Sequence, residues 1–213
     1  MNFSSQKPIN EIWSAILMSL TALVTAWCAY QANLWDSNQS VELALALDNQ
    51  TLHSKELLSS DQHRMMDGII ALEVAKAVAS RQVDLAKFFA SRVREDLRVA
   101  TQAWIALDPL NNSAAPPHAL LMPSYVQNVT EKSLAKQRDY SQKVEHHLST
   151  AQSAGGISDS YVLLTVLFSV VLFFTGISST FHVPRVQTGL IAIATCVFII
   201  SIVKMCYLEI ALG

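Results

Sequence analysis

Charged residues are scarce in this chain, and they are unevenly placed. Only 15% of its 213 residues are charged, against about 25% in an ordinary soluble domain. Five charged residues fall outside 36–159, namely Lys7, Glu11, Arg185, Lys204 and Glu209. This segregation excludes a uniformly soluble globule. The net charge of −2 and the pI near 6.3 give no sign of a protein that binds nucleic acid.

Cysteine is also scarce, and none lies where a disulfide framework would be useful. The three cysteines, Cys28, Cys196 and Cys206, all fall within strongly apolar stretches. The intervening charged region therefore has no disulfides to stabilise it. We interpret the three cysteines as small buried hydrophobic residues.

The familiar sequence motifs of enzymes are missing. The chain has no G-x-S-x-G, no phosphate-binding loop and no G-x-G-x-x-G. His146 and His147 beside Glu145 come nearest to a metal cluster, but adjacent helical residues point in different directions, and zinc-binding helices favour i,i+4 spacing. We therefore predict a non-enzymatic protein with no cofactor and no metal site.

Three stretches are long and apolar enough to cross a bilayer, which takes about 20 residues. They are 12–34, 161–181 and 186–208. Trp13 lies near one end of the first, and Trp27, Tyr30 and Trp35 lie near the other, which is typical of an aromatic belt. A cleaved signal peptide is disfavoured, because the apolar run is too long and Trp27 before Cys28 is no small-residue cleavage site.

The flanking charges predict an orientation. Lys7 and Arg185 lie on one side of the membrane if three spans are crossed in order, whereas the far end of the first span is acidic. The positive-inside bias then places the N-terminus in the cytoplasm and 36–158 in the periplasm. Basic residues upstream of the second span, among them Lys132 and Lys136, are a contrary signal.

The middle of the chain is predicted to be helical. No proline occurs from 35 to 80, and apolar residues from Val83 to Trp104 recur at threes and fours. An unbroken helix from 35 to 107 would rise about 110 Å, whereas the return helix from Ser124 covers only about 45 Å. A break is therefore needed, either at 59–61 or at 80–84 with Ser80 as the cap of the new helix. We expect the return helix to end at Gly155–Gly156.

These inferences give an all-α fold with three transmembrane helices, a helical stalk of coiled-coil type outside the membrane, and a distal cap. Residues 1–35 form a cytoplasmic tail and the first transmembrane helix. Residues 36–158 form an extramembrane helical domain, with a break near 80–84 and a proline-rich loop at 108–123. Residues 159–213 hold the second and third transmembrane helices.

Three segments resemble a family of small bacterial inner-membrane proteins with three spans. The first has the pattern TAW-x2-YQ-x3-W at 25–35, and the third has SD-x-YVL-x-TVLF at 158–168. Between them, 103–125 includes the Trp104 and Asp108-Pro109 region and ends at Pro123-Ser124-Tyr125. The resemblance implies a multi-pass protein of the bacterial inner membrane and supports the break near Ser80, but it implies no activity. The turn after the second span is less basic than the family's.

Small residues recur within the spans and predict helix contacts. The residues concerned are Thr21, Thr25, Ala29 and Asn33 in the first span, and Thr165, Ser169 and Gly176 in the second. Lipid tails give helices no hydrophobic reason to associate, so small residues indicate close helix packing. The contacts are either within one chain or between copies in a homo-oligomer, in which Thr25→Leu or Ala29→Leu would weaken association.

Two polar residues in the spans require either a hydrogen-bonding or charged partner, or a side chain that reaches the membrane interface. Gln31 lies near the membrane boundary. Lys204 lies deep in the third span, where its long side chain can reach the interface, or else pair with Glu209 or another acid.

Trp104 and Tyr125 are predicted to form the core of the cap, with Trp104 packed beneath the 108–123 loop. Alternatively, that loop is a tip that binds a protein partner. We expect changes at His118 or Leu120 to leave folding intact, and to lose a co-purifying partner only if the tip binds one. We predict a structural or interaction (scaffold) protein that contacts membrane lipids, forms a homo-oligomer, and does not bind nucleic acid. The alternatives are a subunit of an oligomeric channel or transport assembly, and an enzyme with an unrecognised site.

Overall fold

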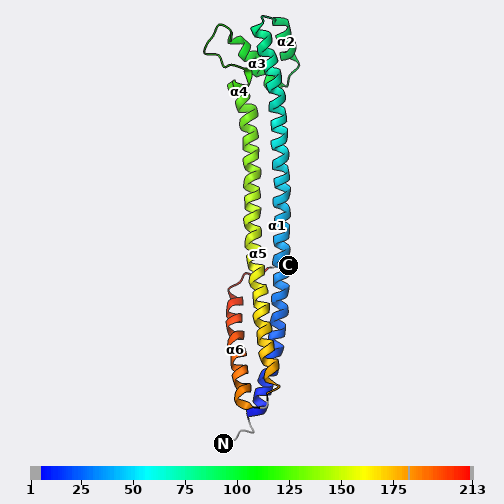
Figure 1. Cartoon of the computed structure of the whole chain (residues 1–213), viewed down its shortest axis with the longest axis vertical. Helices are drawn as coiled ribbons and strands as arrows, with labels where there is room; N and C mark the ends of the chain where they lie inside the picture. The colour runs from blue at the N-terminus through cyan, green and yellow to red at the C-terminus, as the bar shows by residue number, and fades with distance from the viewer. Residues whose placement is uncertain (1–5, 182, 212–213) are drawn as a thin grey trace. The chain divides into compact units, whose positions relative to one another are not determined.

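The computed structural model describes residues 6–181 and 183–211, and the regular elements within this part are helical (Figure 1). Three of the helices are long and apolar enough to cross a membrane, which confirms the all-α, multi-span prediction at that level. In chain order, the elements are α1 (Gln6–Ala79), α2 (Val83–Ser91), α3 (Glu95–Ala106), the 3₁₀ turn η1 (Ala119–Leu121), α4 (Pro123–Tyr125), the π-helical η2 (Val126–Glu131), α5 (Lys132–Ser178) and α6 (Pro184–Cys206).

The chain divides into two compact units. Unit 1 comprises Met1–Ala44 and His147–Gly213, and unit 2 comprises Leu45–His146. The boundaries that we expect at 35 and 158 from the sequence mark the ends of apolar spans. The two units are instead defined by compactness, so their boundaries fall at other residues. Both units draw on α1 and on α5, since each of these helices continues from one unit into the other.

The first helix ends at Ala79 and is continuous through 59–61. Its end is a Schellman motif, in which Gln82 N donates to Ala77 O at 2.9 Å and Arg81 N donates to Val78 O at 3.0 Å. Arg81 adopts the left-handed conformation (φ 55°) that this motif requires. The prediction that Ser80 caps the next helix is wrong. The N-cap of α2 is Gln82, and it makes no side-chain capping bond.

The expected helix end at Gly155–Gly156 is also wrong, because α5 passes through both glycines and ends at Ser178. A helix entering the bilayer keeps its backbone hydrogen bonds inside the segment, which outweighs the weak helix propensity of two glycines. Gly155 serves packing instead. A Cβ placed there would lie 2.8 Å from Nε2 of Gln39.

The core of unit 1 forms where α1, α5 and α6 pack together. One cluster centres on Cys28, Tyr161, Leu164 and Phe168, and Phe198 of α6 packs against it. A second cluster joins Leu17, Val171 and Ala194, one residue from each of these helices. The three candidate spans therefore share one set of core clusters within unit 1.

The core of unit 2 is built around Trp104. Its cluster contains Val74 of α1, Leu97, Ala100 and Trp104 of α3, Ala119 of η1 and Tyr125 of α4. Short helices from different parts of the sequence therefore pack on the last turns of α1. This arrangement brings together the polar residues described next.

Candidate functional site

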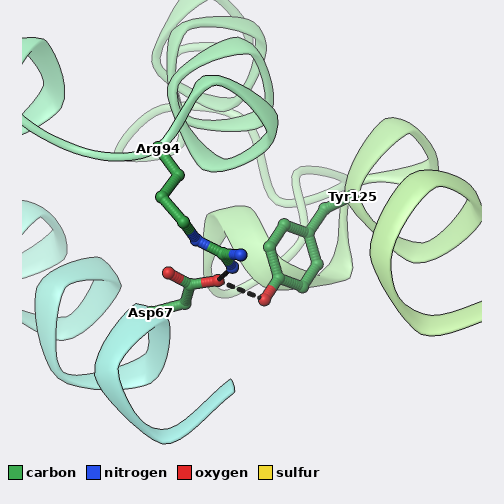
Figure 2. Close-up of polar contacts among 3 residues, drawn as sticks. All are labelled: Asp67, Arg94 and Tyr125. Atoms are coloured by element: carbon green, nitrogen blue, oxygen red, sulfur yellow. Dashed lines mark hydrogen bonds and ion pairs between the residues drawn. The ribbon is translucent and has the colours of Figure 1, made fainter. Parts of the chain in front are cut away.

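A buried carboxylate organises the polar centre of unit 2. Asp67 lies on α1 and is 3% exposed, and its Oδ2 accepts a hydrogen bond from the Tyr125 hydroxyl at 2.7 Å. The same oxygen accepts a hydrogen bond from Nη2 of Arg94, with which Asp67 forms an ion pair. Figure 2 shows the guanidinium and the phenol converging on this carboxylate from two other segments. We call these three residues the Asp67 network.

Local backbone structure places each partner. Arg94 is the N-cap of α3 and has an extended backbone, and Tyr125 is the last residue of α4. The π-helical turn η2 begins immediately after Tyr125. Such turns are rare and occur often at functional sites. The network therefore joins α1, the start of α3 and the start of the return helix.

The electrostatics of the network keep both hydrogen-bond donors protonated. Burial raises the pKa of Tyr125 far above its ordinary value, and its hydrogen bond to Asp67 raises it further. The hydrogen bond to Asp67 is also the main reason that the pKa of Arg94 is raised. Tyr125 is therefore a neutral donor rather than a base. The network is suited to holding three segments together.

A cleft of about 210 Å³ adjoins the network and is lined in part by Arg94. Across it, Lys136 of α5 pairs with Glu56 of α1 at 3.6 Å, and the Ser133 hydroxyl donates to the Ser60 hydroxyl at 2.8 Å. The charged residues that line the cleft are the bases Arg94, Lys132 and Lys136 and the acids Glu56 and Asp96, and His63 lines it as well. Arg94 pairs with Asp67 and Lys136 pairs with Glu56. Two of the three bases are therefore engaged in ion pairs.

Trp104 and Tyr125, which the sequence singled out, lie in the same core, 3% and 2% exposed. The Trp104 indole N–H donates to the carbonyl of Pro116 at 2.6 Å, which ties the proline-rich loop to α3. Leu120 packs against this core, and Nδ1 of His118 is buried with no hydrogen-bond partner among the described residues. The prediction that changes at His118 or Leu120 leave folding intact stays a prediction, and the packing of Leu120 against this core argues against it at that residue.

The small residues predicted to form one packing face on the first span do not share a face. Thr21 is fully buried and Thr25 is partly buried, but Ala29 and Asn33 are exposed. Residues four apart drift by about 40° around a helix with 3.6 residues per turn, so a run of such steps leaves any single face. In the second span, Thr165 is partly buried, Ser169 is exposed, and nothing lies within 4 Å of a Cβ built on Gly176.

Other small polar residues make the contacts between the helices of unit 1. The Ser14 hydroxyl of α1 donates to the carbonyl of Thr175 at 3.3 Å, and the Ser158 hydroxyl of α5 donates to the carbonyl of Ala32 at 3.0 Å. These bonds pair α1 with α5 at both ends of the apolar region. In α6, Ser201 is buried as well.

Gln31 and two aromatic side chains hold the segment that follows α6. The Gln31 amide forms two hydrogen bonds with the backbone of Ala211. The Trp35 indole N–H and the Tyr161 hydroxyl both donate to the carbonyl of Glu209, at 3.2 and 3.0 Å. Lys204 is exposed in the last turn of α6, where a cation is favourable for the helix dipole.

Groups of three or more potential metal ligands do not occur in the part of the chain that the structure describes. His147 lies with its Nδ1 2.7 Å from Oε2 of Glu42, a pairing between α5 and α1 within unit 1.

Comparisons with protein-family models, curated proteins and solved structures find no match for this chain.

Sequence reasoning missed Asp67, the centre of the network. In the sequence it is one acid among many in a charged helix, with no motif around it. One signal was available, since Asp67 lies four and seven residues before Ala71 and Val74 on the buried face of α1. A charged residue on a buried helix face requires a partner.

Proposed function

We propose that this chain is a non-enzymatic protein of the bacterial inner membrane that acts as a scaffold. In this proposal, its three apolar helices anchor it, and its extramembrane helices make protein contacts, first with further copies of itself. The resemblance of its three segments to bacterial inner-membrane proteins supports the location. The flanking charges support a cytoplasmic N-terminus and a periplasmic 36–158.

The observation that carries the proposal is an exposed apolar face on the unit 2 part of α1. Leu58, Met65 and Leu72 are each more than half exposed and follow one another at intervals of seven residues. Leu47 and Ile69 are similarly exposed on the same face. Exposed apolar patches of this kind mark protein interaction surfaces.

This face is distinct from the one that α1 uses within its own unit. The buried residues of this part of α1 include Asp67, Ala71 and Val74. At 100° per residue, they lie roughly opposite the Leu58–Met65–Leu72 face. The helix is therefore apolar on two sides, and the chain itself covers only one of them.

The interval of seven residues suits a second copy of the same helix. A seven-residue apolar repeat keeps one seam in contact between paired helices. Copies inserted into one membrane share an orientation, so their α1 helices run parallel and equivalent residues face one another. A homo-oligomer follows from that symmetry.

The exposed hydroxyls of the spans do not favour the alternative of a channel subunit. Ser19 donates to the carbonyl of Ala15 at 2.9 Å, and Ser169 donates to the carbonyl of Thr165 at 2.8 Å. Their hydrogen bonds are therefore satisfied within their own helices and require no water-filled pore.

Disulfide crosslinking in membranes tests the proposal. In a background with Cys28, Cys196 and Cys206 replaced by alanine, we expect Met65→Cys to link two copies. Met66→Cys is the matched control, because Met66 is exposed to a similar degree but points about 100° away. A monomeric mass in lipid nanodiscs, together with equal crosslinking of the two variants, would contradict the proposal, and ion flux through liposomes would instead favour the channel.

A further inference from the structure

A groove of about 340 Å³ lies in unit 1, at the end of the first apolar span. Residues 35–42 of α1, residues 150–157 of α5 and Glu209 line it. Its position is fixed by the hydrogen bonds from Trp35 and Tyr161 to the carbonyl of Glu209, which hold the segment after α6 beside α1 and α5.

The groove lies at the depth of lipid headgroups. Trp35 follows directly on the apolar stretch 12–34, and Glu42 comes seven residues later on the same helix, about 10 Å further along its axis. The headgroup layer is roughly 5–8 Å thick on each side of the hydrocarbon core. The groove therefore extends from the edge of the hydrocarbon to the outer limit of the headgroups.

The lining of the groove combines apolar residues with polar and acidic ones. Val41 and Ile157 contribute aliphatic surface, and Trp35 contributes an indole ring whose N–H is already bonded. Such a surface suits the glycerol and upper acyl region of a lipid. A small soluble metabolite would gain little from it.

The charges of the lining are acidic. Glu42 and Glu209 are its two acidic residues, and the groove's described lining contains no lysine or arginine. His147 faces Glu42 at 2.7 Å, whereas no ion pair engages the Glu209 carboxylate in the described residues. Glu209 can therefore accept hydrogen bonds from an ammonium group, and the face of Trp35 is a second favourable neighbour for a cation.

We propose that this groove binds a phospholipid with a primary ammonium headgroup, of the phosphatidylethanolamine type. The ammonium lies against Glu209 and Glu42, the Asn38 amide donates a hydrogen bond to the phosphate, and the apolar lining residues contact the start of an acyl chain. The inference rests on membrane insertion as set out under the proposed function, but not on self-association.

Lipid retention by the full-length protein tests this assignment. Purified protein in detergent is mixed with phosphatidylethanolamine, phosphatidylcholine or phosphatidylglycerol of identical acyl chains. Bound lipid is measured by native mass spectrometry, and the thermal midpoint is measured in parallel. We expect the ethanolamine lipid to be retained best and to raise the midpoint most.

Two carboxylate variants and one matched control localise the effect. Loss of one charge-assisted hydrogen bond in Glu209→Gln is expected to weaken retention about tenfold or more. Glu42→Gln provides a second variant, and both are compared at equal helicity by circular dichroism. Asp36→Asn removes an exposed carboxylate one residue from Trp35 that does not line the groove, and it should retain lipid normally.

Three outcomes overturn the assignment. The first is equal retention of phosphatidylglycerol, and the second is normal retention by both carboxylate variants. The third is full competition by free phosphoethanolamine at equal concentration, which would assign the groove to a soluble amine. Each of these results leaves the crosslinking test of self-association unaffected.

Discussion

Gln31 and Ala211, 180 residues apart, are joined by both ends of one side-chain amide. The backbone N–H of Ala211 donates to Oε1 of Gln31 at 2.9 Å, and Nε2 of Gln31 donates to the carbonyl of Ala211 at 3.3 Å. Gln31 is fully buried, so this pair meets the hydrogen-bonding requirement of a polar side chain near the membrane boundary. The segment after α6 is held to α1 by this means.

Replacing Gln31 with leucine should release that segment. Two hydrogen bonds are lost, each worth about 0.5–1.5 kcal/mol, and the backbone of Ala211 loses its partner. We expect amides around Ala211 to exchange hydrogen with solvent at least tenfold faster, measured by mass spectrometry. Asn33→Leu is the control, because Asn33 is exposed on the same helix. Unchanged exchange in Gln31→Leu would show that Trp35 and Tyr161 suffice.

Two arginines of unit 2 should differ in their contribution to stability. Arg94→Ala leaves the buried Asp67 carboxylate without its cation, which should lower the free energy of unfolding by about 2 kcal/mol or more. Arg98→Ala breaks an exposed i,i+3 pair with Glu95 and should change the free energy of unfolding by less than about 1 kcal/mol. Chemical denaturation of the two variants measures the difference, and equal effects would contradict a stabilising role for the network.

Alkaline pH should weaken the Asp67 network through Tyr125. The folded protein raises the pKa of this phenol above its ordinary value of 10.0. A raised pKa means that the folded state holds the proton more tightly, so this stabilisation is complete below pH 10 and is lost as pH rises above it. We expect Tyr125→Phe to lower the thermal midpoint at neutral pH and to show a smaller further loss than wild type between about pH 9 and pH 11. Parallel curves for the two proteins would exclude Tyr125 as the group responsible.

Adjacent glycines of α5 should differ in their response to alanine. Nothing lies within 4 Å of a Cβ at Gly156, so Gly156→Ala should gain about 0.5–1 kcal/mol from improved helix propensity. At Gly155 the Cβ would meet the Gln39 amide at 2.8 Å, so that side chain must move and the gain is reduced or reversed. Thermal midpoints in detergent compare the two, and Gly155→Ala at least as stable as Gly156→Ala would show that Gln39 moves without cost.

Two positions in the first span should separate folding from association. Thr21 is fully buried, so Thr21→Leu overpacks the chain's own helices and should cost about 1–3 kcal/mol. Ala29 is exposed, so Ala29→Leu should leave the stability of one chain unchanged. The thermal midpoint and the oligomeric mass of each variant are measured together. An Ala29→Leu protein with lower stability at unchanged mass would place Ala29 in the chain's own packing.

The features that could be predicted are those that depend on local sequence, whereas features that depend on contacts between distant segments could not be predicted. Apolar stretches of bilayer length predicted the three long helices, because backbone in hydrocarbon must satisfy its own hydrogen bonds. The end of α1 could not be explained from local sequence. Its Schellman motif places Arg81, rather than glycine, in the left-handed region, and the packing of α2 and α3 on Val74 accompanies that turn.

The sequence by itself determined that this chain is helical, that three of its helices suit a membrane, and that its charge is concentrated between them. These properties depend on composition and on periodicity along the chain. Only the tertiary structure decided which polar residues meet. Asp67 with Arg94 and Tyr125, and Gln31 with Ala211, are contacts between distant segments. The position of a residue on a helix fixes the direction of its side chain, but its partner depends on which helices pack against that face. Small residues repeated every fourth position also drift around the helix, so that Thr21 and Asn33 lie about 120° apart.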